Sequence, residues 1–274
     1  MHLEVLDYEF MRRALLAALL IGLAAPSVGV YLVQRRLALI GDGLGHVALT
    51  GVAVGLVTST TPVLTALVAA VLGAVVVEII RTSGRASGDV ALAVLFYGGI
   101  AGGVVIVSKA PAGTSVNLDS YLFGSITTTT TGDLRVFAIL ALVVLAVTYG
   151  LGRYLFAVGN DEEYARASGL PVLTLNLLLA VVTSVTVVVS MRVVGLLLIS
   201  ALMVIPVATA QLLARSFRGT VALATALGVA ASVGGAGASY YLDTPSGGTI
   251  VLVAIAAFVV VAAATAIRHQ FSRD

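Results

Sequence analysis

Almost the whole chain consists of long apolar runs separated by short polar segments. A helix needs about 20 apolar residues to cross a bilayer. The pattern predicts nine spans, at roughly 13–33, 40–57, 62–80, 90–108, 134–152, 171–190, 193–214, 220–240 and 247–267. Only Met191 and Arg192 separate the sixth span from the seventh, which favours either a tight turn or one broken helix. The expected count is therefore about nine, with a range of about eight to ten.

The composition supports a membrane environment. Of the 274 residues, 59% are hydrophobic and 10% are charged, whereas soluble domains carry about 25% charged residues. Only helices and closed barrels satisfy their own backbone polar groups in hydrocarbon, and the alternating pattern of a membrane barrel is absent. We expect an all-α, polytopic transmembrane helical bundle that forms one domain over residues 1–274.

Basic residues near the span ends predict the orientation, because cytoplasmic loops carry an excess of Lys and Arg. With the N-terminus outside and the C-terminus inside, ten of the fifteen basic residues lie on the cytoplasmic side: Arg35, Arg36, Arg81, Arg85, Arg153, Arg166, Arg215, Arg218, Arg268 and Arg273. The opposite orientation reverses this bias.

Two connections are longer than turns. The outer one, 109–133, holds an apolar piece around Tyr121 and a Thr run at 127–131, which suits an interfacial or re-entrant element and equally a plain surface loop. The inner one, 153–170, predicts a short charged helix at about 159–169. Asp161 or the preceding Asn can cap an acidic first turn, and Gly169 can end the helix.

Asp42 and His46 are the main candidates for chemistry, because ionisable residues within spans are costly and usually functional. Their i, i+4 spacing places both side chains on one helical face. Imidazole and carboxylate together suit zinc, manganese or ferrous iron. Two ligands are not a full shell, but a symmetric dimer would supply four. The alternative is an Asp–His hydrogen bond that holds the helix near its cytoplasmic end.

Other residues in the spans indicate packing. Gly41 with Gly45, and Gly51 with Gly55, have the G-x-x-x-G spacing that lets a second helix or a second protomer approach closely. Pro206 lies within a span, where it predicts a kink. Glu78 precedes Arg81 by three residues, which predicts an ion pair at the level of the headgroups.

Several motifs are absent from the sequence. There is no Cys, so thiolate metal sites are excluded, and Lys109 is the only lysine. No G-x-x-x-x-G-K-[ST] loop is present. If ATP drives transport, the hydrolysis therefore takes place on another polypeptide, and no nucleic-acid partner or resident cofactor is expected.

The chain resembles the membrane permease subunit of bacterial ABC importers for zinc, manganese and iron. The segments that carry the resemblance are spread over nearly the whole chain; they are 36–46 with 51–55, 120–125 (SYLFGS), 161–169, 194–210 (VGLLLISALMVIPVATA) and 241–248 (YLDTPSGG). One departure is that Gly43 and Gly45 stand where the family often has Ala and Ser, which could loosen the helix near Asp42.

The resemblance implies a homodimer in the bacterial cytoplasmic membrane, two cytoplasmic ATP-binding subunits and an extracytoplasmic metal-binding protein. It places Asp42 and His46 in the pathway of a transported zinc or manganese ion, with alternating access at the dimer interface. It also implies that the segment 159–169 is a coupling helix that docks on the ATPase, through Asp161, Glu162, Glu163, Ala165, Arg166 and Gly169.

Two other classes of function remain as alternatives. The first is an ion-coupled secondary metal transporter that uses Asp42 and His46 as a proton relay, although the sequence shows no clear internal repeat. The second is a membrane-embedded enzyme with a catalytic metal, which would normally need more polar residues within its spans.

Overall fold

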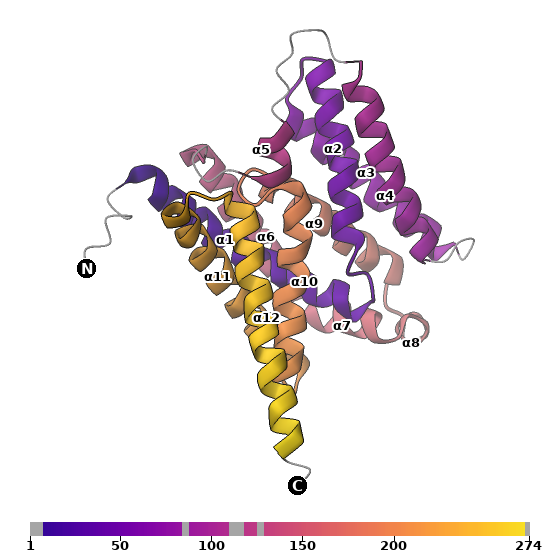
Figure 1. Ribbon diagram of the computed structural model, residues 1–274. Coiled ribbons are helices and arrows are strands. Elements are labelled where there is room, and N and C mark those ends of the chain that lie inside the picture. Colours follow the sequence, from indigo (N-terminus) through magenta and orange to yellow (C-terminus); the bar gives the residue numbers. More distant parts are fainter. Residues whose placement is uncertain (1–7, 84–87, 110–117, 125–128, 272–274) are drawn as a thin grey trace.

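The fold is all-helical over the part of the chain that the computed structural model describes, residues 8–83, 88–109, 118–124 and 129–271. The helices, labelled in Figure 1, are α1 (Glu9–Gln34), α2 (Ile40–Val57), α3 (Pro62–Thr82), α4 (Gly88–Val107), α5 (Leu118–Phe123), α6 (Thr131–Gly150), α7 (Gly152–Asn160), α8 (Glu162–Ala167), α9 (Val172–Ser190), α10 (Leu196–Leu213), α11 (Phe217–Leu242) and α12 (Ser246–Phe271). The prediction of an all-α helical bundle is confirmed.

Eight of these helices are long and apolar enough to cross a membrane: α1, α2, α3, α4, α6, α9, α11 and α12. The remaining predicted span, 193–214, corresponds to α10, in which the apolar stretch Leu198–Leu213 is shorter. Residues 191–195 form a non-helical link between α9 and α10, so these two helices are separate. Eight long spans fall at the lower end of the range that the sequence predicts.

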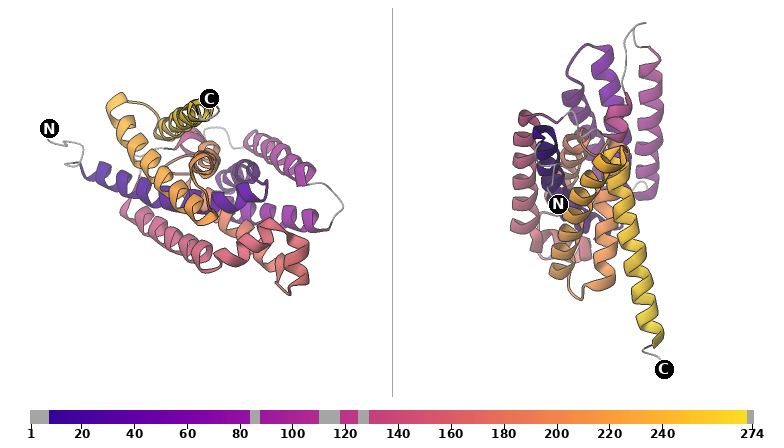
Figure 2. Two further views of the ribbon diagram at one scale, coloured as in Figure 1. Left: turned by 90° about the horizontal axis from the view of Figure 1, so that it is seen from below. Right: turned by 60° about the vertical axis from the view of Figure 1, so that its left-hand side comes forward.

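The helices form two groups joined by α9 and α10. In Figure 1, α2, α3 and α4 lie together at the upper right, whereas α1, α6, α11 and α12 lie on the other side of α10. α1 and α9 are mostly buried, and α4 and α12 mostly expose apolar side chains. Figure 2 shows α12 along the outside of the bundle. Exposed apolar faces on helices of this length suit contact with lipid.

Three chain reversals meet backbone to backbone at one point of the fold. Gly195, in the link before α10, packs against the last turn of α5, and Gly124 after α5 packs against the same link. Gly247 at the start of α12 lies against both segments, and the Ser246 hydroxyl donates a hydrogen bond to the Val193 carbonyl oxygen (3.1 Å). Residues 122–124, 193–195 and 246–247, which are far apart in sequence, therefore meet here.

Gly195→Ala is expected to destabilise this junction by more than about 2 kcal/mol, because an L side chain is strained at φ 92° and would collide with the α5 backbone. Gly234→Ala in α11 is the matched control, since open space surrounds Gly234 and Ala favours a helix more than Gly does. Thermal unfolding in detergent should show a lower midpoint for the first variant and an equal or higher one for the second. Equal midpoints would show that the junction is not tightly constrained.

Candidate metal site and coupling helix

Asp42 and His46 lie one turn apart in the first half of α2, and both side chains are half-buried. Among the contacts of the described residues, no hydrogen bond joins the Asp42 carboxylate to His46. This geometry does not support the alternative of an Asp–His hydrogen bond. Within the same residues, no group of three or more His, Cys, Asp or Glu side chains comes together. One chain therefore presents two potential ligands rather than a complete metal shell.

The His46 ring is held with one nitrogen unsatisfied. Its edge packs against Phe96 of α4, with ring centroids 4.4 Å apart. Gly99 of α4 lies against the His46 backbone, and the Thr50 hydroxyl donates to the Gly99 carbonyl oxygen (2.6 Å), so the two helices touch closely here. The buried Nδ1 has no hydrogen-bond partner among the described residues. Because an unsatisfied buried nitrogen is costly, a ligand at this position would relieve that cost.

The glycines of α2 face other helices of the same chain. Gly41 and Gly45 face α10, whereas Gly51 and Gly55 face α3. Both G-x-x-x-G faces are therefore covered within one protomer, and neither is open for a second protomer. The close contacts also fix α2 in place, which positions Asp42 and His46.

The two glycines that depart from the family pattern permit close packing. A side-chain carbon added to Gly43 would lie 3.0 Å from Leu95 of α4, and one added to Gly45 would lie 2.8 Å from the Leu196 carbonyl oxygen. Here the absence of side chains therefore lets α4 and α10 approach the helix beside Asp42. The sequence suggested a looser helix, but the structure shows a tightly enclosed one.

The charged helix predicted at about 159–169 corresponds to α8, which spans Glu162–Ala167 and follows directly after α7. The Asp161 side chain caps α8 by accepting a hydrogen bond from the Tyr164 amide (2.9 Å). At the other end, Gly169 has φ 79°, and the amides after Ser168 bond back to the carbonyls of Ala165 and Arg166. This is a Schellman end, which needs a left-handed residue at that position.

The two faces of α8 differ. Ala165 is buried against the protein, whereas Glu163, Tyr164 and Arg166 are exposed. Glu162 belongs to neither group, because its carboxylate turns into a polar network beneath the helix. The exposed side chains form one charged surface, and Glu162 holds the helix to the bundle.

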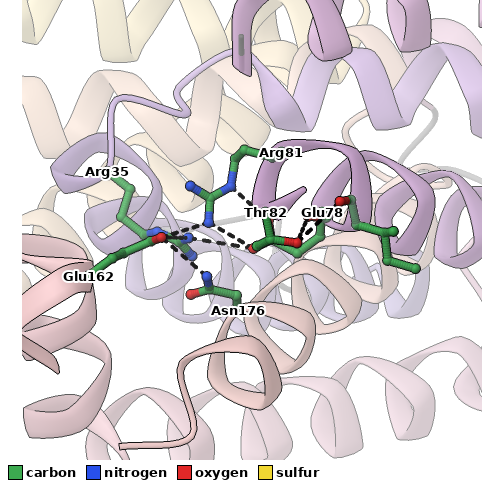
Figure 3. A network of polar contacts seen from close by, with 7 residues as sticks. Arg35, Glu78, Arg81, Thr82, Glu162 and Asn176 are labelled. Atoms are coloured by element: carbon green, nitrogen blue, oxygen red, sulfur yellow. Dashed lines mark hydrogen bonds and ion pairs between the residues drawn. The ribbon is translucent and has the colours of Figure 1, made fainter. Parts of the chain in front are cut away.

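Figure 3 shows this network, which joins four parts of the chain. One oxygen of Glu162 accepts hydrogen bonds from Arg35 (2.9 Å), Arg81 (2.6 Å) and the Asn176 amide (3.2 Å). Arg81 also contacts Glu78 of α3 through two nitrogens, at 2.8 and 3.1 Å. The network therefore links α8 to the end of α1, to α3 and to α9.

The charges in the network balance each other in a largely dry environment. The side chains of Arg35 and Glu78 are 6% and 2% exposed. Burial and the neighbouring Arg81 lower the pKa of Arg35, although both Glu side chains act in the opposite direction. Partial burial alone would raise the pKa of Glu162, but Arg81, Arg35 and Asn176 bring it below its ordinary value. The two arginines and the two glutamates therefore each stabilise the charged form of the other pair.

The sequence predicted the Glu78–Arg81 pair but not its surroundings. The i, i+3 contact is present. The prediction of a headgroup-level pair was incomplete, because Glu78 is buried and also lies 3.8 Å from Arg35. The partner from α8 is 81 residues away from Arg81 in the sequence, so local spacing gives no signal for it.

Comparison with known proteins identifies the family. Residues 7–265 match the model of the ABC 3 transport family. The chain belongs to the ABC 3 transport family. It is 31% identical to the manganese transport system membrane protein MntC of Halalkalibacterium halodurans, over 93% of this chain and 87% of that protein. It is 29% identical to the high-affinity zinc uptake system membrane protein ZnuB of Haemophilus influenzae, over 92% and 96% of the two chains.

A solved structure shares the family fold. PsaBC from Streptococcus pneumoniae, in complex with Fab, matches with a TM-score of 0.83 at 29% identity and covers 95% of both chains. This member of the ABC 3 transport family is thus a multi-pass membrane protein of a transport family, and its helices have the arrangement of that neighbour.

Two prolines lie inside long helices of this ABC 3 chain, and both helices continue through them. Pro206 lies inside α10 as predicted, and it lines a small apolar cavity of about 120 Å³ between α10, α11 and α12. Pro26 lies inside α1 and packs against Gly228 of α11, a contact that the sequence analysis did not single out. The cavity leaves open space beside Pro206, whereas Pro26 is covered by Gly228 of α11.

Proposed function

We propose that this ABC 3 family chain is the transmembrane permease of an ATP-driven importer of divalent first-row metal ions. The observation that carries the proposal is the pair formed by Asp42 and the unsatisfied Nδ1 of His46 on a tightly held helix. The relatives named for manganese and zinc transport support a divalent cation as cargo. Carboxylate and imidazole accept either metal, so these ligands set the class of substrate and not the element.

A homodimer would supply enough side chains for a complete metal site. Each chain offers Asp42 and His46, and a two-fold axis would add a second pair to give four ligands. The Gly41 and Gly45 face is already covered by α10. The partner would therefore meet α2 on the side where Asp42 and His46 are half-buried. Transport needs a site that binds the ion weakly enough to release it.

The two faces of α8 support a role in coupling transport to ATP hydrolysis. We propose that the exposed Glu163, Tyr164 and Arg166 dock on a cytoplasmic ATP-binding subunit, one for each protomer. Glu162 then passes the movement to α1, α3 and α9 through the network. The predicted orientation, with the N-terminus outside, places α8 in the cytoplasm and leaves the opposite side for a metal-binding protein that delivers the ion.

Metal-resolved uptake tests this function. In a cell that lacks this chain, restoring it is expected to restore the cellular content of manganese, zinc or iron, measured by elemental mass spectrometry. The purified chain alone, in vesicles with a proton gradient, is expected to move no metal. Uptake driven by the gradient alone would replace the proposal with an ion-coupled carrier, and no change in any metal on restoration would refute metal import.

A further inference from the structure

A cavity of about 680 Å³ opens between α1, α6, α7 and α11, and its lining includes neither Asp42 nor His46 and no residue of the α8 network. Its walls are largely aromatic and apolar, with Tyr31, Tyr149, Phe156, Phe217 and Val221 among the lining residues. Two guanidinium groups, those of Arg153 and Arg218, also line it. A volume of this size is in the range of small-molecule sites, and the proposed transport mechanism makes no use of it.

The two arginines carry uncompensated charge. Both are exposed, and neither forms an ion pair within the described residues. The carboxylates of Glu78 and Glu162 are taken by Arg35 and Arg81, and that of Asp133 by Arg192. Arg153 lies over the Tyr154 ring, 5.0 Å from its centroid, which orients the side chain but does not neutralise it.

The start of α11 adds to this positive character. α11 begins at Phe217, and its cap Ser216 accepts a hydrogen bond from the Gly219 amide (3.1 Å). The helix itself has no acceptor for the amides of Phe217 and Arg218 at its first turn. The positive end of a 26-residue helix and two arginines therefore converge on the same cavity.

The positively charged cavity lies where several membrane spans end. Tyr31 lies in the last turn of α1, Gly150 ends α6 and Phe217 begins α11, so three spans end at one level. In the predicted orientation this level is the inner surface of the membrane. Tyr149 is 59% exposed and Phe156 is 38% exposed, so the apolar wall is open to the outside of the bundle. Aromatic side chains of this kind favour the headgroup level.

We propose that this cavity binds the headgroup of an anionic phospholipid, with the phosphate on Arg153, Arg218 and the start of α11, and the first carbons of the lipid on the aromatic wall. Basic pockets between spans on the cytoplasmic side suit such headgroups. The apolar wall distinguishes a lipid from a soluble phosphate ion, which would leave that surface uncovered. The lipid would join α1, α6 and α11 at the inner surface.

Native mass spectrometry of the delipidated full chain tests the proposal. Phosphatidylglycerol and phosphatidylcholine with identical acyl chains are titrated separately against the wild type, with the double variant Arg153→Gln/Arg218→Gln and the control Arg166→Gln/Arg268→Gln run beside it. The control removes the same charge from exposed arginines of the same side that do not line the cavity. Inorganic phosphate competes in a further arm.

The wild type and the control are expected to bind phosphatidylglycerol roughly tenfold or more tightly than phosphatidylcholine, and the cavity variant is expected to lose that preference. Arg153→Lys/Arg218→Lys should retain most of the preference, which separates loss of charge from loss of folding. Equal binding of the two lipids by the wild type, or equal loss in the control, would overturn the proposal. Complete competition by millimolar phosphate would assign the site to a soluble anion instead. Because the readout needs neither metal nor ATPase, it does not depend on the transport proposal.

Discussion

Replacing Asp42 with Asn, or His46 with Ala, is expected to lower metal uptake by the assembled transporter at least about tenfold, because even outer-shell partners of a metal ligand change affinity by about 10–100-fold. Asn keeps the shape of Asp42 and removes the negative charge, and Ala removes the imidazole whose Nδ1 lacks a partner. Uptake of manganese and zinc is measured separately, together with the amount of chain in the membrane. Both variants should reach the membrane at the parental level.

The control for the first substitution is Asp243→Asn. Asp243 is exposed and ends α11 with φ 51°, a conformation that Asn also tolerates, so uptake should not change. His46→Gln serves as a second test at the imidazole, because it fills more of the space beside Phe96 than Ala does. Parental uptake in both Asp42→Asn and His46→Ala would refute the ligand assignment. Loss of the chain from the membrane in His46→Ala but not in His46→Gln would show that packing caused the first result.

The pattern of apolar runs predicts most of the helices, because in a membrane each span must satisfy its own backbone polar groups within a contiguous segment. α10 shows the limit of that approach. Gly195 stands immediately before it with φ 92°, and the link 191–195 is not helical, so α10 begins later and is shorter than the predicted span. Met191 and Arg192 mark a break in the sequence, but the hydrophobicity on both sides of the link is nearly the same, and the contacts of Gly195 and its neighbours with α5 and α12 explain where α10 begins.

The candidate site could be predicted only as far as local spacing reaches. Asp42 and His46 are four residues apart, and Glu78 and Arg81 are three apart, so helical geometry alone places each pair together. Glu162 and Glu163 are adjacent and identical residues, so the sequence does not distinguish them, yet only Glu162 enters the buried network. The rotation of α8 about its axis decides this, and that rotation depends on Ala165 packing inward and on donors from distant helices.

The ionisation of Glu162 also follows from the network. Its pKa lies below the ordinary value of 4.5. A carboxyl group whose pKa is lowered on folding stabilises the folded protein fully at any pH above its ordinary pKa. This contribution is lost as the pH falls through the lowered pKa of the folded state. Near neutral pH Glu162 is therefore ionised, and substitution with Gln removes a full negative charge from the network.

Glu162→Gln and Glu163→Gln are expected to impair transport for different reasons. The first leaves the buried Arg35 and the partly buried Arg81 with one carboxylate, that of Glu78. Breaking a fully buried pair costs about 3–5 kcal/mol, and since the Glu162 side chain is 29% exposed we expect about 1–2 kcal/mol. This corresponds to roughly 2–4 °C in the unfolding midpoint for each kcal/mol in a chain of this size. The second variant removes an exposed charge and should leave the midpoint unchanged, but it should weaken association with the ATPase subunit.

Two measurements on the same pair of variants separate these roles, the thermal unfolding midpoint of the purified permease and its co-purification with the ATPase subunit. Glu162→Gln should lower the midpoint, and Glu162→Gln with Arg35→Gln should cost less than the sum of the two single changes, since the pair removes opposite charges that face each other at 2.9 Å. Additive effects would show that Arg35 and Glu162 are not coupled. If Glu163→Gln lowered the midpoint as much as Glu162→Gln, or if both variants retained the ATPase equally, the division of α8 into an anchoring side chain and a docking face would be wrong.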